Sequence, residues 1–199
     1  LIHRDYHRLG AVHVRLEDDA LVVSNPGGLV DGVTLANLLV TEPRPRNPAL
    51  ADALKRIGLV ERAGRGVALI YRGLLRYGRH VPDFSLSSLH SVVLSLSLAV
   101  ADEPFLKVIL EEEARRAKEL PVDSLIVLAA LREQRRASTE QLATFVQKEP
   151  ARITGTIEAL VEAGLLQAHG AGRGRTYTLS PNLYGLLGEQ TEYIQQAGF

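Results

Sequence analysis

The first hundred residues combine short stretches of strand-like alternation with stretches of helical spacing. Apolar residues recur at every second position, or in short runs, at 11–16, 21–23 and 91–100. The acidic turn 17–19 separates the first two stretches, so they predict a β-hairpin, which Asn25-Pro26-Gly27-Gly28 then ends. Helical spacing follows at 49–57, which stops at Gly58, and at 66–77. Together these patterns predict an α+β layer.

Beyond residue 104 the pattern becomes helical. Helices are expected at 105–120, 122–131, 139–147 and 150–163. Ser138 and Gln141 have the spacing of a capping box at the start of the third of these helices. Pro150 suits the first turn of the fourth helix, and Gly164 ends it. Three helices with a tight second junction, 122–163, predict a helix-turn-helix.

Two strands follow this helix-turn-helix. Residues 165–169 and 175–179 alternate in the manner of strands, and the glycine-rich turn 170–174 joins them. Arg173 and Arg175 give the hairpin a basic tip. A hairpin at this place predicts the winged form of the helix-turn-helix. The turn imitates a dinucleotide-binding loop, but it precedes a strand and follows no βαβ pattern, which excludes that interpretation.

Composition is that of a globular protein, and it limits the classes of function. The 199 residues are 46% hydrophobic and 23% charged, which is enough for two ordinary cores. The chain has no cysteine, which excludes disulfides and cysteine metal sites, and no signal peptide or long apolar span, so a cytoplasmic location and no membrane partner are expected. It also has no methionine and opens on Leu1, which suggests the downstream part of a longer protein.

Charge argues against strong, sequence-independent binding of nucleic acid by the whole chain. The formal net charge is +0, and residues 121–180 carry seven Lys/Arg against six Asp/Glu, a net charge of +1. Any affinity for DNA must therefore come from a local patch.

In a helix-turn-helix the last helix enters the major groove by its N-terminal half, and the wing can reach a neighbouring backbone. The predicted DNA contacts are Ala151, Arg152, Thr154, Gly155, Thr156, Arg173 and Arg175.

The strings Ile157 to Leu166 and Gly172 to Tyr177 resemble the winged-helix family of bacterial transcription regulators over roughly sixty residues. The resemblance implies a fold, and its use as a DNA-binding module. The same fold also serves as a dimerisation or protein-docking unit, so that alternative stays open. A regulator of this type is expected to bind double-stranded DNA as a homodimer.

Three strings in the first hundred residues resemble a second family: His3 to Tyr6, Asn25 to Leu29, and Arg46 to Pro48 continuing through 58–67. They look like the divergent ATP-binding domain of the GHKL type, shared by gyrase, the large heat-shock chaperone, histidine kinases and MutL. This version lies downstream of an AlbA or Schlafen-like domain in bacterial transcriptional regulators, often labelled as related to the RecG DNA helicase. The resemblance implies a cofactor, ATP with Mg²⁺. It also implies a catalytic Glu and a magnesium-binding Asn upstream of Leu1, so no catalytic residue is assigned here.

By the same resemblance, two glycine-containing strings are the candidate nucleotide-binding residues. They are Asn25, Gly27 and Gly28, and Gly64, Arg65 and Gly66. Glycines allow close approach of the backbone to phosphate, and Arg65 adds a positive charge. Asn25-Pro26 stands where the family has the acidic residue that hydrogen-bonds adenine. The alternative is that both strings are ordinary turns and helix caps.

No metal site is expected, since His13 and His90 have no partner at metal-ligand spacing and His3 is expected to cap or pack locally.

Taken together, the patterns and resemblances predict an α+β protein, a partial ATPase-like sandwich followed by a winged helix-turn-helix. The expected domains are 1–104, degenerate and ATPase-like; 105–120, a linker helix; 121–180, the winged helix-turn-helix; and 181–199, a helical tail. The predicted function is a DNA-binding transcriptional regulator with a sensor or assembly domain. The alternatives are an ATP-dependent, helicase-related enzyme acting on DNA, and a winged helix used for docking.

Overall fold

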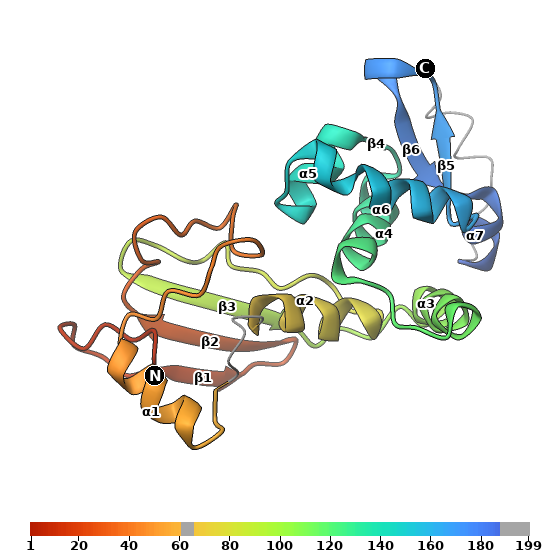
Figure 1. The fold of residues 1–199 in the computed structure, drawn as a ribbon. Helices are drawn as coiled ribbons and strands as arrows, with labels where there is room; N and C mark the ends of the chain where they lie inside the picture. The colour runs from red at the N-terminus through yellow and green to blue at the C-terminus, as the bar shows by residue number, and fades with distance from the viewer. Residues whose placement is uncertain (61–65, 188–199) are drawn as a thin grey trace. The chain divides into compact units, whose positions relative to one another are not determined.

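Two units divide the chain, and each contains a small antiparallel sheet (Figure 1). The computed structural model describes residues 1–60 and 66–187. Unit 1 comprises Leu1–Leu74 and Arg79–Val100, and unit 2 comprises Leu75–Gly78 and Ala101–Phe199. This mixture of helices and antiparallel sheets confirms the predicted α+β class.

The sheet of unit 1 has the strand order β1-β2-β3. Its strands are β1 (His13–Leu16), β2 (Ala20–Pro26) and β3 (Ser91–Ser97), and the helices that follow β2 in sequence are α1 (Pro48–Arg56) and α2 (Gly66–Arg76). The turn 17–19 between β1 and β2 is closed by the N–H of Glu17, which donates to the carbonyl of Ala20 at 2.8 Å. The strand order places β1 at an edge of the sheet, and all four of its residues are exposed.

Two strand ends in unit 1 differ from the prediction. β2 ends within the predicted string, at Pro26, but Asn25 and Pro26 still belong to the strand and lie opposite Val92 and Ser91 of β3. Pairing with a strand far away in the sequence here overrides the turn preference of Asn-Pro-Gly. The other error is the end of β3, which stops at Ser97 rather than at Val100.

Unit 2 contains the longest continuous series of helices. Its elements are α3 (Glu103–Arg116), α4 (Val122–Gln134), β4 (Ala137–Ser138), α5 (Thr139–Val146), α6 (Pro150–Glu162), β5 (Leu166–His169), the short 3₁₀ helix η1 (Gly172–Gly174), β6 (Thr176–Leu179) and α7 (Pro181–Leu186). β4 was not predicted. It pairs with β6, which lies between β4 and β5 in the sheet. The helix predicted at 105–120 begins earlier, at the cap Asp102, and ends earlier, at the left-handed residue Ala117.

Local signals in the sequence explain how the helices of unit 2 begin. The Ser138 side chain accepts a hydrogen bond from the Gln141 N–H, and the Gln141 side chain accepts one from the Ser138 N–H, which confirms the capping box. Pro150 occupies the first turn of α6, as predicted. Gly164 follows α6 with a φ of 72°, a left-handed conformation that glycine adopts without strain.

The two units differ in the size of their cores. Among the described residues, the buried apolar side chains of unit 1 are those of Val22, Ala51 and Pro82. Unit 2 buries a continuous set from α3 to α7, including Leu125, Leu128, Leu142, Ile153, Ile157, Leu160 and Leu179. Each such aliphatic side chain contributes about 1.5–3 kcal/mol on burial. The hydrophobic stabilisation of the chain is therefore concentrated in unit 2.

Candidate functional site

The N-terminal half of α6 presents the predicted DNA contacts on one side of the helix. We call Ala151, Arg152, Thr154, Gly155 and Thr156 the α6 face. Ile153 and Ile157 point into the core, being 0% and 1% exposed, so α6 is held by its opposite side. Of the α6 face, Thr156 is half-buried and the other four residues are exposed.

The α6 face combines one cation with small side chains. No atom lies within 4 Å of the position that a Cβ would take on Gly155, so the helix surface is open there. The hydroxyl of Thr154 donates to the carbonyl of Pro150 at 3.2 Å and keeps its acceptor lone pairs toward solvent. An open surface of this kind allows close approach of another molecule to the helix backbone.

Charge is distributed unevenly along α6 and the residues before it. Arg152 lies in the first turn, whereas the acidic Glu158 and Glu162 lie in the second half of the helix, and both are exposed. Lys148, just before the helix, forms an ion pair with Asp123. The N-terminal end of α6 thus combines Arg152 and the positive end of the helix dipole with one exposed acidic residue, the N-cap Glu149, whereas the second half of the helix has two acidic residues.

The hairpin β5–β6 carries the second set of predicted contacts. The guanidinium of Arg175 lies 5.4 Å from the centre of the Tyr177 ring, which leaves its N–H groups available as donors. Arg173 lies in η1, but its side chain is outside the described part of the structure. The α6 face and the hairpin belong to the same unit, so both sets of contacts share one scaffold.

This hairpin also holds a polar pair that the sequence did not suggest. Nε2 of His169 lies 2.9 Å from Oγ1 of Thr178. Burial, and then the charge of Arg136, lower the pKa of His169. His169 is therefore a neutral imidazole near pH 7 and adds no charge to the hairpin.

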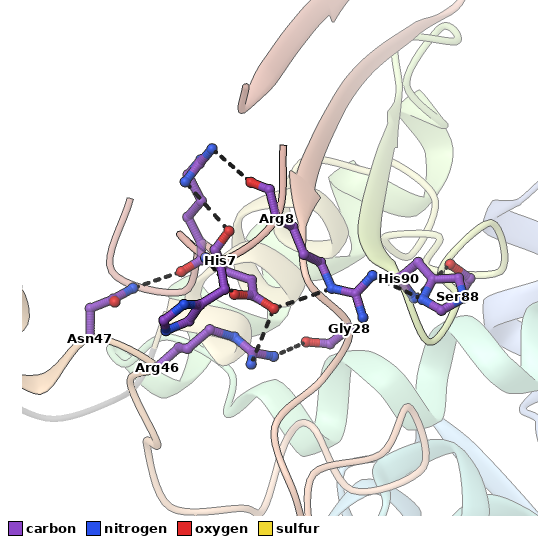
Figure 2. A network of polar contacts seen from close by, with 9 residues as sticks. His7, Arg8, Gly28, Arg46, Asn47, Ser88 and His90 are labelled. Atoms are coloured by element: carbon purple, nitrogen blue, oxygen red, sulfur yellow. Dashed lines mark hydrogen bonds and ion pairs between the residues drawn. The ribbon is translucent and has the colours of Figure 1, made fainter. Parts of the chain in front are cut away.

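In unit 1 the three strings that resemble the ATPase family converge on one polar network, which we call the Asp5 network (Figure 2). The carboxylate of Asp5 accepts hydrogen bonds from the His7 N–H at 3.0 Å and from Nε of Arg8 at 3.2 Å. Nη1 of Arg46 lies 3.9 Å from Oδ2 of the same carboxylate. The His7 N–H, followed by the charges of Arg46 and Arg8, holds the pKa of Asp5 below its ordinary value.

Backbone groups complete the Asp5 network. The N–H of Asp5 donates to the carbonyl of Pro26 at 2.8 Å, and Nη2 of Arg46 donates to the carbonyl of Gly28 at 2.8 Å. Asn47 donates to the carbonyl of Arg4 at 2.7 Å (Figure 2). The network therefore joins the N-terminal segment, the end of β2 and the segment before α1.

This role of Asp5 and Arg46 was not predicted, although both residues lie in the strings that resemble the ATPase family. One signal was present in the sequence: Asp5 is the single acidic residue among residues 1–15, which contain three arginines. A lone carboxylate among arginines is expected to become their shared partner. The arrival of Arg46 at the same carboxylate depends on the tertiary fold and could not be predicted.

The glycines at the end of β2 are packed against other parts of unit 1. A Cβ on Gly27 would lie 2.5 Å from Cβ of Asp5, and the φ of Gly27 is 97°. A Cβ on Gly28 would lie 2.7 Å from the carbonyl oxygen of Leu89. Both residues must be glycine because the protein itself fills the space beside them.

This packing decides how well ATP, the cofactor that the family resemblance implies, fits here. Asp5 fills the space that a Cβ of Gly27 would take, and the backbone of Leu89 fills that of Gly28. Among the described residues, the buried side-chain oxygen Oδ1 of Asn25 has no hydrogen-bond partner. The Cβ side of Gly27 and Gly28 is therefore closed to a ligand, and nucleotide binding by these residues stays a prediction.

The second candidate string lies mostly outside the described residues, which exclude Gly64 and Arg65. Gly66 is the first residue of α2, and a Cβ there would meet no atom within 4 Å. Its backbone is thus accessible, in contrast to that of Gly27. Binding of nucleotide by Asn25, Gly27, Gly28, Gly64, Arg65 and Gly66 stays a prediction.

The histidines and acidic residues form no metal centre in the part of the chain that the structure describes. Within residues 1–60 and 66–187, no group of three or more His, Asp or Glu side chains is arranged to hold a metal ion. His13 lies on the exposed strand β1, and His90 precedes β3, where its Nδ1 lies 3.1 Å from Nη1 of Arg8. In the same ranges, no helix combines the length and the apolar character needed to span a bilayer.

Comparison with known proteins supports an ATPase-like unit 1. Residues 10–96 match the family model described as "Putative ATP-dependent DNA helicase recG C-terminal", so this stretch is a divergent domain of the ATPase-like type. None of the curated proteins matches the chain.

Two solved structures are similar to the chain. The crystal structure of the DIP2311 protein from Corynebacterium diphtheriae is 27% identical, with a TM-score of 0.78, and the match covers 93% of this chain and 39% of that one. The chain therefore spans well under half the length of this relative. The structure of Staphylococcus aureus MarR in complex with salicylate and kanamycin is 21% identical over 48% of this chain and 66% of that one. Its TM-score of 0.31 is too low to establish a common fold.

Proposed function

We propose that the chain is part of a DNA-binding transcriptional regulator, whose unit 2 is a winged helix-turn-helix that contacts duplex DNA. In this proposal α5 and α6 are the two helices of the helix-turn-helix and the hairpin β5–β6 is the wing. The observation that carries the proposal is the α6 face, where an exposed Arg152 lies among small residues on a helix anchored by its buried side. An exposed, rigidly held helix surface of this kind suits insertion into a major groove.

The positions of the charges favour one orientation on DNA. Arg152 is near the N-terminal end of α6, and the acidic Glu158 and Glu162 are toward the other end. Phosphates are attracted to the first end and repelled by the second. We therefore infer that the N-terminal half of α6 lies in the groove, with Arg175 of the wing directed to a neighbouring backbone.

Substitution of Gly155 by alanine tests this proposal directly. Gly155→Ala is expected to raise the free energy of unfolding by about 0.5–1 kcal/mol, because alanine is the better helix residue and the site has no close neighbour. The same methyl group is expected to weaken duplex binding several-fold, because it holds the helix away from the base edges. Stability is read from urea unfolding, and affinity from the anisotropy of a labelled duplex.

Gly185 provides the matched control, since it is an exposed glycine in α7 and a Cβ there would also meet no atom within 4 Å. Gly185→Ala is expected to leave duplex affinity unchanged. If Gly155→Ala stabilises the chain and leaves duplex affinity unchanged as well, α6 does not contact DNA by this face. That result would favour the docking alternative for the winged helix.

For unit 1 we propose an assembly role, within a longer regulator that carries an AlbA or Schlafen-like domain upstream. The family match favours a second candidate function, an ATP-dependent enzyme that acts on DNA. The packing of Asp5 and Leu89 against Gly27 and Gly28 supports the assembly role, because it occupies the space beside both glycines.

Addition of ATP with Mg²⁺ to a longer chain that includes the residues upstream of Leu1 distinguishes these two functions, because the family resemblance places the catalytic Glu and the magnesium-binding Asn there. The assembly role predicts that the melting temperature of the chain does not change with nucleotide, since a ligand stabilises only the folded state that binds it. The control is the same titration with Mg²⁺ alone. A melting temperature that rises with ATP concentration would establish binding and restore the enzyme alternative.

A further inference from the structure

The sheet β4-β6-β5 of unit 2 (Figure 1), which we call the wing sheet, has one apolar side and one polar side. Ala137, Tyr177 and Leu179 lie on the apolar side and are at most 5% exposed. Side chains alternate between the two sides along each strand. The register and the position of Arg136 directly before β4 therefore give two rows on the polar side, which we call the wing face: Ser138, Thr176 and His169, and then Arg136, Thr178 and Gln167.

A buried hydroxyl lies in the middle of the wing face. Thr178 is 4% exposed, and its Oγ1 lies 2.9 Å from Nε2 of His169. The other ring nitrogen of His169, Nδ1, has no hydrogen-bond partner among the described residues. When the Thr178 hydroxyl donates to Nε2, the proton of the neutral imidazole is on Nδ1, which is then a donor without a protein acceptor.

The guanidinium of Arg136 also has no acceptor in the described part of the chain. The residue is half-buried, its guanidinium makes no ion pair or hydrogen bond there, and its Nε is buried without a partner. A guanidinium has five N–H donors and stays charged at any physiological pH. Because a half-buried donor without an acceptor is unfavourable, this group favours the binding of an acceptor from outside the chain.

The two groups lie close enough to act on each other. The charge of Arg136 contributes, after burial, to the lowered pKa of His169. Two other charged groups adjoin the wing sheet: Glu140, whose carboxylate accepts a hydrogen bond from the Ser138 hydroxyl at 2.8 Å, and Arg175, which stacks on a ring of the apolar side. Within the described ranges, no carboxylate pairs with Arg136 or His169. An anion bound between these two groups would remove the repulsion that disfavours the imidazolium.

We propose that Arg136 and His169 bind an oxyanion of the phosphate type on the wing face, with Thr178 holding the imidazole in position. A phosphate group has three acceptor oxygens, enough for the guanidinium and for the Nδ1–H group together. The site goes beyond the proposed contact of α6 with DNA, because it consists of other residues and needs no duplex to be filled. Its phosphate group belongs either to a duplex backbone or to a small phosphorylated molecule, and the experiment separates these two sources.

The experiment follows the imidazole resonances of the full chain by NMR while sulfate is added at constant ionic strength, with chloride as the reference. Sulfate is the probe because its charge, unlike that of phosphate, does not change near neutral pH. Sulfate is expected to raise the pKa of His169 by about one unit, which means about tenfold tighter binding to the imidazolium than to the imidazole. The affinity for sulfate therefore increases as the pH falls through the pKa of His169. The resonances of His13, on the exposed strand β1, are the internal control and are expected not to respond.

Arg136→Gln is the variant that tests the site. Without sulfate the pKa of His169 is expected to rise, because the repulsion is removed, and sulfate is then expected to shift it no further. Lys118→Gln is the matched control, since it removes one positive charge at an exposed residue outside the wing face, and it is expected to respond to sulfate as the unmodified chain does. Circular dichroism checks that both variants remain folded. Sulfate that leaves the His169 resonances of the unmodified chain unchanged, or that shifts them equally in Arg136→Gln, would overturn the proposal.

A second titration, with a duplex in place of sulfate, distinguishes the two sources of phosphate. If the duplex also raises the pKa of His169, and Arg136→Gln weakens duplex binding severalfold more than Lys118→Gln does, the site binds a backbone phosphate. If sulfate shifts His169 and the duplex does not, the site binds a small phosphorylated molecule. Both results support the oxyanion site. A chain that binds sulfate at His169 and binds no duplex would contradict the proposed function of α6 alone.

Discussion

Replacement of Gly27 by alanine is expected to destabilise unit 1 by about 2–4 kcal/mol. Two causes act together. The φ of Gly27 is 97°, which an alanine adopts only with strain, and the new Cβ would lie 2.5 Å from Cβ of Asp5. Because the Asp5 network holds that side chain from several directions, Asp5 cannot move away without losing its hydrogen bonds.

Hydrogen exchange of the β2 and β3 amides measures this effect within unit 1 alone. Gly73→Ala in α2 is the matched control, since a Cβ there would meet no atom within 4 Å. The control is expected to increase protection slightly, because alanine favours the helix. Equal protection factors for Gly27→Ala and the unmodified chain would show that the Asp5 network does not pack against the end of β2 as described.

Reversal of the charge on α6 is the second substitution with a large expected effect. Arg152→Glu is expected to weaken duplex binding by roughly tenfold to a hundredfold, because it removes an attraction and introduces a repulsion beside a phosphate or base edge. Stability should change little, since the side chain is exposed. The measurement is the anisotropy of a labelled duplex at low ionic strength.

Lys118→Glu is the control for Arg152→Glu, because it changes the net charge equally at an exposed residue outside α6 and the wing. A purely non-specific electrostatic effect would weaken binding alike in both variants. The proposed contact predicts a much larger effect for Arg152→Glu. If the two variants bind the duplex with equal affinity, Arg152 makes no particular contact with the DNA.

Much of unit 2 could be predicted because its signals are local. The capping box of Ser138 and Gln141, the proline at the start of α6 and the glycine after it each act within one helical turn. The predicted helices of this region therefore agree with the observed ones to within a few residues. β4 was not predicted because two residues are too few to show the alternation of apolar and polar residues that is typical of a strand. Only its pairing with β6 identifies it as a strand.

Unit 1 was harder to predict because its structure depends on contacts between distant segments. The string from Asn25 to Gly28 has the composition of a turn, yet its first half is held in β2 by residues more than sixty positions away. Its glycines suggest room for a ligand, whereas Asp5 and Leu89 fill that room. From composition alone, a glycine that lies beside a ligand cannot be distinguished from a glycine against which another part of the protein packs.

The central claim, that α6 and the wing contact duplex DNA, is tested most directly by the salt dependence of binding. The logarithm of the dissociation constant is measured against the logarithm of salt concentration for the unmodified chain and for a variant with Arg152, Arg173 and Arg175 replaced by alanine. If these arginines each neutralise a phosphate, the slope decreases by about 2–3 in the variant. An unchanged slope, or an unmodified chain that does not bind a duplex at low salt, would contradict the claim.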